Sequence, residues 1–156
     1  NFIKMLWRSL VDEYKIEPIG LAARDILRLE MGYRLYGNDI NENINPIESN
    51  LSWILDKKND FIGKENMSQF IKKKLVLFLL KEKGVPRKGY KIFHKNNEIG
   101  EVTSGTFSPT LNKGIAMGYV EINFSTKKNF TIKVRDKFLK TEIMQTSFVN
   151  GTSIFN

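Results

Sequence analysis

The sequence predicts an α+β protein, with a helical first part over residues 1–72 and a small antiparallel β-barrel or sandwich over residues 73–156. Apolar residues recur at helical spacing near the start of the chain, which indicates amphipathic helices. From about residue 73 they form short runs of strand length separated by Gly and Pro, as is typical of small all-β domains. The chain has 156 residues, of which 41% are hydrophobic, so it can bury a core.

Two helices are expected in the first part. The first is expected over about residues 2–15, where helical spacing relates Ile3, Trp7, Leu10 and Tyr14. Pro18 and Gly20 end this helix. The second helix is expected over residues 22–31, with Gly32 as its C-terminal cap.

The rest of the first part is expected to be mostly loop. The Asn-rich residues 38–50 contain spaced isoleucines and therefore indicate an ordered loop rather than disorder. A short apolar segment at residues 49–55 is centred on Trp53, and a further helix is expected within residues 61–70, after Gly63.

After a linker at residues 68–74, the pattern predicts short strands at residues 75–80, 91–94, 99–103, 115–120, 130–134 and 138–144. Asn96–Asn97 and Asp136–Lys137 predict tight turns between neighbouring strands. Residues 100–109 are dense in small hydroxyl side chains, and we interpret them as a loop that lines a cleft. They lack the Gly-Lys-Ser/Thr sequence of a phosphate-binding loop.

The composition excludes several kinds of site. The chain has no cysteine, which excludes disulfides, thiolate metal sites and a cysteine nucleophile. His94 is the only histidine, so a histidine zinc site or a Ser-His-Asp triad lacks its parts, and no metal site is expected. No apolar run reaches the roughly 18–20 residues of a membrane span, and no secretory signal stands at the start, so no membrane partner is expected. Because the chain does not begin with Met, we expect it to be part of a longer protein.

The net charge of +8 raises the question of a polyanionic partner. A nucleic-acid-binding module gathers basic and aromatic residues on one face, whereas the lysines here are scattered along the chain. We therefore expect a solvated basic surface and no nucleic-acid partner.

Arg24 and Arg28 are the first candidates for ligand binding. They lie four residues apart on the second predicted helix and therefore share a face. Two guanidinium groups side by side can clamp a carboxylate or a polar heterocycle. The alternative is a pair of surface charges that form ion pairs with Asp25 and Glu30.

Four further residues carry open alternatives. Trp53 offers a flat ring to a planar ligand, but a core tryptophan is the commoner case. Arg87 lies in a predicted exposed loop, where it could contact a ligand or only solvent. Glu48 is either a ligand contact or a capping or surface group, and His94 is expected to be a strand residue near a turn.

An ordered series of motifs resembles the glycine-cleavage T proteins. In the first part these are Gly-Leu-Ala-Ala-Arg-Asp at residues 20–25, Leu-Arg-Leu-Glu at 27–30, Leu-Tyr-Gly-Asn-Asp-Ile at 35–40, Pro-Ile-Glu at 46–48 and Leu-Ser-Trp at 51–53. In the second part they are residues 100–105, Ser108-Pro109 and Ile-Ala-Met-Gly-Tyr-Val at 115–120. The matches keep their order over almost the whole chain, which makes the resemblance specific.

The resemblance implies a fold and an activity. T proteins have three domains around a central hole that holds folate. Residues 1–72 would be the end of a ferredoxin-like folate-binding domain, and residues 73–156 the C-terminal barrel domain. The implied enzyme is an aminomethyltransferase that moves a one-carbon unit from the aminomethyl-lipoyl H protein to tetrahydrofolate and releases ammonia.

The resemblance also implies partners and a place in the cell. The partners are the lipoylated H protein and tetrahydrofolate, in the cytoplasm of a bacterium or the mitochondrial matrix of a eukaryote. The family's catalytic aspartate is expected outside this segment, so the segment holds no expected catalytic residue and should be inactive alone.

Three residues are carried over as folate-site candidates. Arg24 matches a family arginine that contacts folate, Trp53 a tryptophan that lines the folate site, and Arg87 an arginine near the active cleft. A family tyrosine near the C-terminus corresponds to Ser153, which is a departure.

Two related families offer alternatives. One is the folate-binding region of a sarcosine or dimethylglycine dehydrogenase-like demethylase; residues 35–39 favour the T protein. Folate-binding relatives in iron–sulfur cluster maintenance use a signature cysteine that this sequence lacks.

Overall fold

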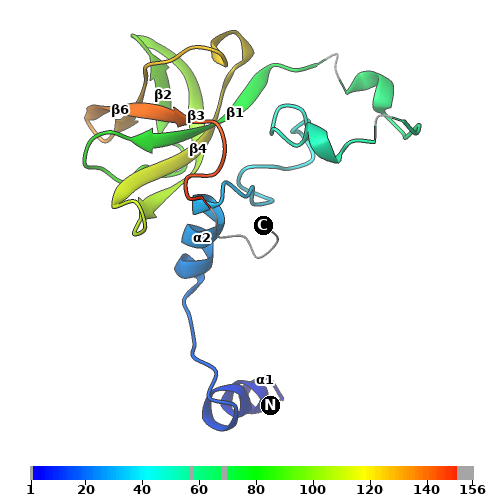
Figure 1. Ribbon diagram of the computed structural model, residues 1–156, viewed down its shortest axis with the longest axis vertical. Coiled ribbons are helices and arrows are strands. Elements are labelled where there is room, and N and C mark those ends of the chain that lie inside the picture. The colour runs from blue at the N-terminus through cyan, green and yellow to red at the C-terminus, as the bar shows by residue number, and fades with distance from the viewer. Residues whose placement is uncertain (1, 57, 68–69, 151–156) are drawn as a thin grey trace.

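The computed structural model describes residues 2–56, 58–67 and 70–150, and its centre is a closed antiparallel barrel. In chain order the strands are β1 Lys73–Leu80, β2 Lys91–His94, β3 Asn97–Ser108, β4 Lys113–Glu121, β5 Phe130–Val134 and β6 Lys137–Met144. Around the barrel they follow the order β1-β4-β3-β2-β5-β6, and β6 pairs with β1 to close the sheet (Figure 1). The barrel expected from the sequence is confirmed, and the sandwich alternative is wrong.

β1 lies between two hydrophobic clusters, which explains its unbroken apolar sequence. Phe78 and Leu80 belong to the core inside the barrel. Leu75 and Leu77 belong to a second cluster, together with Leu29 from the helix α2 (Leu21–Glu30). Because neighbouring side chains of a strand point to opposite faces, a strand covered on both sides needs apolar residues at every position.

β3 is longer than expected. It runs without interruption to Ser108 and pairs with β4 as far as Lys113, so the interpretation of residues 100–109 as a loop is wrong. In the structure the hydroxyl side chains of this strand face polar groups outside the barrel. The strand therefore has a polar sequence, which is why its pattern predicted a loop. The two predicted turns lie one residue earlier than expected, at Lys95–Asn96 and Arg135–Asp136.

The two expected helices are present to within two residues of their predicted bounds. The first consists of α1 Phe2–Arg8 and a π-helical turn, η1 Ser9–Glu13, and α2 is the second. Gly32 follows the end of α2 with a φ of +70°, in the left-handed region where glycine is favoured, as expected of a cap.

The third predicted helix, within residues 61–70, is wrong for the described residues. A single 3₁₀ turn, η3 Lys64–Asn66, forms there, and another, η2 Ser52–Ile54, contains Trp53. Ile62 beside this turn is fully exposed, so the segment lacks the apolar partner that would stabilise a longer helix.

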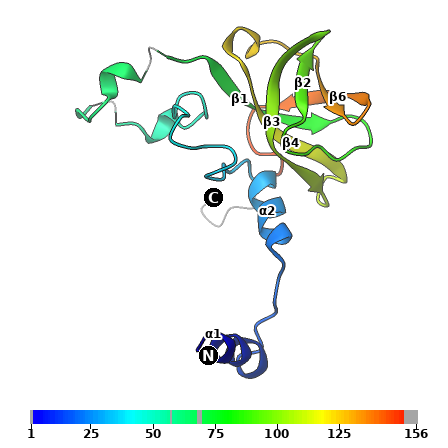
Figure 2. The ribbon, with the colours of Figure 1, turned by 180° about the vertical axis from the view of Figure 1, so that it is seen from behind.

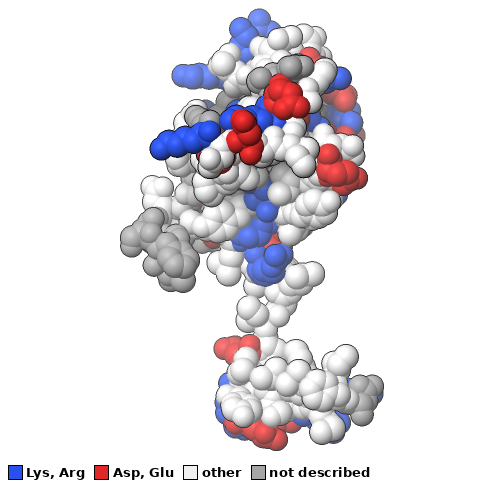
Figure 3. Space-filling model, turned by 90° about the vertical axis from the view of Figure 1, so that its right-hand side faces the viewer, with Lys and Arg blue, Asp and Glu red and all other residues white. Residues whose placement is uncertain are grey.

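The first part of the chain extends away from the barrel (Figures 1 and 2). The C-terminal end of α2 meets the barrel, while α1 lies at the far end of an extended connection, and the segment with η2 and η3 projects to one side. Most apolar side chains of α1 are exposed; Trp7 is 59% exposed. On the face seen in Figure 3, acidic side chains lie among the basic ones from the barrel to α1.

Candidate functional site

Arg28 occupies the centre of a buried polar joint between α2 and the barrel. Its Nε donates to Asp25 Oδ1 at 2.8 Å, and its Nη2 donates to the Ser104 hydroxyl on β3 at 2.8 Å. Its Nη1 donates to the Tyr33 carbonyl at 3.0 Å and to Asp39 Oδ2 at 2.6 Å. These contacts engage all three nitrogens, so Arg28 is a structural residue of the joint.

Asp39 receives contacts from four parts of the chain and is completely buried. Its carboxylate accepts hydrogen bonds from Arg28 of α2, from the Leu35 N–H and from the Thr103 hydroxyl of β3. Its carbonyl accepts the Tyr119 hydroxyl of β4 at 2.8 Å. A buried carboxylate is tolerated when it is paired and hydrogen-bonded in this way.

A β-bulge at Thr103 creates this arrangement. The β3–β4 register shifts between Val102 and Ser104. Val102 packs in the barrel core, whereas Ser104, two residues further on, bonds to Arg28 outside the barrel. Residues two apart in a regular strand face the same side, so the bulge is what turns the hydroxyl residues of β3 toward α2.

Two further buried carboxylates hold the first part of the chain to the barrel. Glu30 accepts the hydroxyls of Ser108, at 2.5 Å, and Thr110, at 3.0 Å. Glu48 Oε1 accepts the backbone N–H groups of Lys72 and Lys73, at 2.8 and 3.1 Å. Glu48 is therefore a capping group for the start of β1, which is one of the alternatives expected for it.

Tyr119 is held in its neutral form. Burial, and then the negative charge of Asp39, raise the pKa of the Tyr119 phenol. The raised pKa favours the protonated phenol, which is the form that donates to the Asp39 carbonyl.

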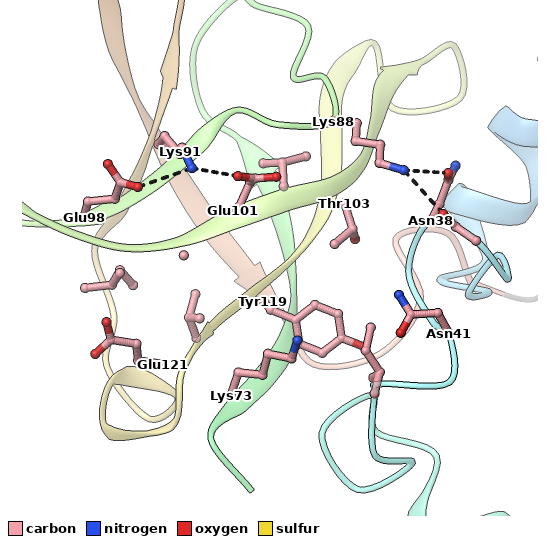
Figure 4. Close-up of a pocket in the computed structure, with 16 residues that line it drawn as sticks. Asn38, Asn41, Lys73, Lys88, Lys91, Glu98, Glu101, Thr103, Tyr119 and Glu121 are labelled. Carbon is pink, nitrogen blue, oxygen red and sulfur yellow. Dashed lines mark hydrogen bonds and ion pairs between the residues drawn. The ribbon is translucent and has the colours of Figure 1, made fainter.

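A polar groove of about 580 Å³ opens beside the joint, between residues 37–44 and the strands β3 and β4 (Figure 4). At one side Lys91 pairs with Glu98 and Glu101, at 3.4 and 2.7 Å. At the other side Lys88 donates to the Asn38 amide oxygen at 3.0 Å. Lys73 places its ammonium 4.9 Å from the Tyr119 ring centroid. The groove can hold a polar ligand, and its described lining contains no histidine or cysteine that would act as a base or nucleophile.

Arg24 and Arg28 have different environments. Arg28 is 9% exposed in the joint, whereas Arg24 lies exposed on the part of α2 that extends from the barrel. The expected ion pair between Arg28 and Asp25 is present, at 2.7 Å, but Glu30 bonds to the barrel instead. The clamp of two neighbouring arginines is therefore not formed, and Arg24 alone presents a guanidinium group to the surroundings.

Trp53 and Arg87 lie in two other regions. Trp53 is 79% exposed, so the core alternative is wrong, and it lines a cleft of about 520 Å³ with Arg34 and Met144. Arg87 is exposed and lines a cleft of about 560 Å³ with Tyr90. The elements that carry Arg24, Trp53 and Arg87 lie apart in Figure 1, and Ser153 lies outside the described residues.

The described residues contain no group of three His, Cys, Asp or Glu side chains placed to hold a metal ion. Within the same part of the chain, no helix has the length and apolar character needed to cross a membrane.

Comparison with known proteins places the chain in a family. The family model for the glycine cleavage T-protein C-terminal barrel domain matches residues 73–150, and the one for the GCVT N-terminal domain matches residues 1–59. An aminomethyltransferase from Aquifex aeolicus is 48% identical over 148 residues, which cover 94% of this chain and 42% of the relative. One from Thermosipho melanesiensis is 40% identical over 151 residues, which cover 94% of this chain and 41% of the relative.

A solved structure agrees with these relatives. The crystal structure of glycine cleavage system aminomethyltransferase T from Bartonella henselae matches with a TM-score of 0.80 and 32% sequence identity, over 94% of this chain and 43% of that protein. The chain thus spans less than half the length of the relatives it matches. From this agreement of family models, relatives and fold, the chain belongs to the glycine cleavage T-protein family.

Proposed function

We propose that this chain acts as the C-terminal portion of a glycine cleavage aminomethyltransferase and contributes part of a tetrahydrofolate site. The main support for this proposal is the match to aminomethyltransferases over 94% of the chain, at up to 48% identity. In the proposed reaction, the one-carbon unit passes from aminomethyl-lipoyl H protein to tetrahydrofolate with release of ammonia. The names of the relatives favour this reaction over the demethylase alternative.

Arg24 supports a ligand contact on α2. No hydrogen bond or ion pair joins its side chain to another described residue, and the side chain is exposed. An unpaired guanidinium can bind a folate carboxylate or a pterin oxygen by a charge-assisted hydrogen bond. Trp53 and Arg87 are proposed for the same site; the exposed ring of Trp53 offers an aromatic surface to a planar ligand.

We assign no acid–base role to this segment. In the expected mechanism the catalytic aspartate lies elsewhere in a T protein, and the basic surface of this chain favours approach of an acidic H protein. The proposed location is the cytoplasm of a bacterium or the mitochondrial matrix of a eukaryote.

The assay of the chain alone tests this division of labour. Purified 156-residue protein is given loaded H protein and tetrahydrofolate, with the full-length Aquifex aeolicus relative as positive control. We expect turnover to be lower by at least about 10²–10⁴, the contribution of one acid–base group, and folate binding to be weak because half of the enclosing wall is missing. Methylene-tetrahydrofolate formation at the rate of the relative would place the catalytic group within these residues.

A completed enzyme tests Arg24. We define the completed enzyme as this chain joined to the N-terminal portion of the Aquifex aeolicus relative. Arg24→Ala should weaken folate binding by about 1.5–3 kcal/mol, the value of a hydrogen bond to a charged group. Lys140→Ala, which removes one exposed charge from β6, is the control and should leave the Kd unchanged. An unchanged Kd for Arg24→Ala would show that Arg24 is a surface charge that does not contact folate.

A further inference from the structure

Among the described residues, α2 is anchored to the barrel at its C-terminal end. Its buried residues are Arg28, Leu29 and Glu30, the last three of the helix. The preceding turns project beneath the barrel, and they include the exposed Arg24 (Figure 1). The direction of the projecting part is therefore set at the anchored end.

The contacts at the anchored end are mostly polar and therefore directional. Leu29 is the one apolar residue of α2 that is buried, whereas Arg28 and Glu30 bond to Ser104 and Ser108 of β3. Apolar packing constrains orientation loosely because it is non-directional, while hydrogen bonds weaken steeply as their angle departs from linearity. The polar contacts therefore define the angle of the helix.

Asp39 and Thr103 link these contacts into one unit. Thr103 is the bulged residue of β3, and its hydroxyl donates to Asp39 Oδ1, while Arg28 donates to the other oxygen of the same carboxylate. The barrel and the helix thus meet on one buried group that the Leu35 N–H also holds.

A small change at this joint moves Arg24 by a distance that matters for binding. Arg24 and Arg28 are separated by about 6 Å along the helix axis, at about 1.5 Å per residue. A tilt of about 10° at Arg28 therefore displaces the Arg24 backbone by about 1 Å, and its guanidinium by more. Displacements of about 1 Å at a positioned group cost up to about 10²-fold in function.

We propose that Asp39 and Thr103 are positioning residues that fix the angle of α2 to the barrel and thereby the place of Arg24. The geometric part of this inference stands on the joint alone, and its consequence for folate rests on the proposed function. The barrel then acts in binding through the helix that it orients, in addition to any contact of its own.

The angle can be measured in this chain directly. The chain has no cysteine, so Ala22→Cys on α2 and Lys140→Cys on β6 permit clean spin labelling at two exposed positions. Pulsed electron–electron double resonance measures the distance distribution between the two spin labels. We expect Thr103→Val to widen this distribution at least about twofold.

Thr141→Val is the matched control. The Thr141 hydroxyl donates a buried hydrogen bond to the Phe130 carbonyl at 3.0 Å, within the barrel, whereas the Thr103 hydroxyl has its partly buried bonds at the joint. Loss of the Thr141 bond should lower stability by a similar amount and leave the distance distribution narrow. Equal distributions for Thr103→Val and the parent, or equal widening for both variants, would overturn the inference whatever the chain binds.

The completed enzyme tests the consequence for folate. Thr103→Val should raise the folate Kd by about tenfold, and Thr141→Val by less than twofold. In an Arg24→Ala background the effect of Thr103→Val should fall below twofold, because the positioned group is gone. A full tenfold effect in that background would refute positioning of Arg24. If Arg24→Ala itself has no effect, the proposed folate role of Arg24 fails, while the spin-label result still decides whether the joint sets the helix angle.

Discussion

Glu48 offers a sharp test of how the loop of residues 45–50 is held to the barrel. It is 4% exposed, and one carboxylate oxygen accepts the backbone N–H groups of Lys72 and Lys73. The other oxygen faces the Asn45 N–H at 3.4 Å, and the Glu48 carbonyl accepts the Leu75 N–H at 2.7 Å. The side chain therefore satisfies the donors at the point where β1 begins.

The expected loss follows from these contacts. Glu48→Gln keeps an oxygen for Lys72 and Lys73 but removes the charge, and hydrogen bonds to a charged group contribute about 1 kcal/mol more than neutral ones. Two such bonds give a loss of about 2 kcal/mol in the free energy of unfolding. Glu48→Ala leaves the N–H groups of Lys72 and Lys73 without this acceptor. A fully buried donor without a partner costs about 1–3 kcal/mol, and these two are only partly buried, so we expect a loss of about 2–4 kcal/mol.

Urea denaturation at neutral pH measures both losses through the transition midpoint. Glu121→Gln is the matched control, because Glu121 is exposed and its side chain bonds to no other described residue; it should change stability by less than about 0.5 kcal/mol. If Glu48→Gln unfolds at the same urea concentration as Glu121→Gln, the carboxylate does not hold the start of β1 and the reasoning is wrong.

Two other predictions concern the barrel and its joint. Because the pKa of Tyr119 is raised in the folded protein, the phenol contributes stability below about pH 10, the ordinary tyrosine value, and this contribution is lost as pH rises further. Tyr119→Phe should therefore reduce the alkaline loss of stability in denaturation curves measured between about pH 9 and 12. An unchanged dependence of stability on pH would contradict this prediction. Gly100→Ala would place a Cβ 1.9 Å from the Tyr119 carbonyl oxygen, so we expect a loss of about 3 kcal/mol or more. Gly20→Ala should unfold like the parent, because no atom of a described residue other than its chain neighbours lies within 4 Å of the added Cβ. Similar melting temperatures for the two variants would show that the sheet adjusts freely.

Apolar periodicity predicted the barrel well because the buried positions of its strands are occupied by apolar residues. The run Leu75–Leu80 is unbroken where β1 is covered on both faces, and the strands of the last hairpin were placed within one residue. Turn residues were placed less accurately, because Lys95 and Arg135 adopt positive φ values that their residue types do not favour.

The polar joint was not predicted because the spacing of polar residues in the sequence does not indicate which of them are buried. Ser104 and Ser108 read as loop residues, although they lie in a strand. Ser104 bonds to Arg28 and Ser108 to Glu30, 76 and 78 residues away in sequence, and both follow the bulge at Thr103. Asp39 lies in the Leu-Tyr-Gly-Asn-Asp motif, but that motif points to a family and not to a contact with β3.

Arg24 and Arg28 show how spacing alone can mislead about a site. The helical spacing was right, and it placed both side chains toward one face of α2. Which of the two is available depends on where the helix leaves the barrel, and that is a tertiary property. The buried arginine is structural, and the exposed one bonds to no other described residue.

The contacts across the joint also bear on how the chain divides into cooperative units. The predicted division at residues 72 and 73 follows the change in sequence pattern and stays a prediction. Arg28, Glu30, Asp39 and Glu48 nevertheless each bond to residues of the barrel part, Glu48 through the N–H of Lys73. Residues 28–50 should therefore unfold together with the barrel, because breaking these bonds would leave buried charges without partners.

α1 has no such contacts among the described residues, and a seven-residue helix is too short to be stable on its own. We therefore expect the boundary between the cooperative units to fall within α2, between its projecting part and its buried end.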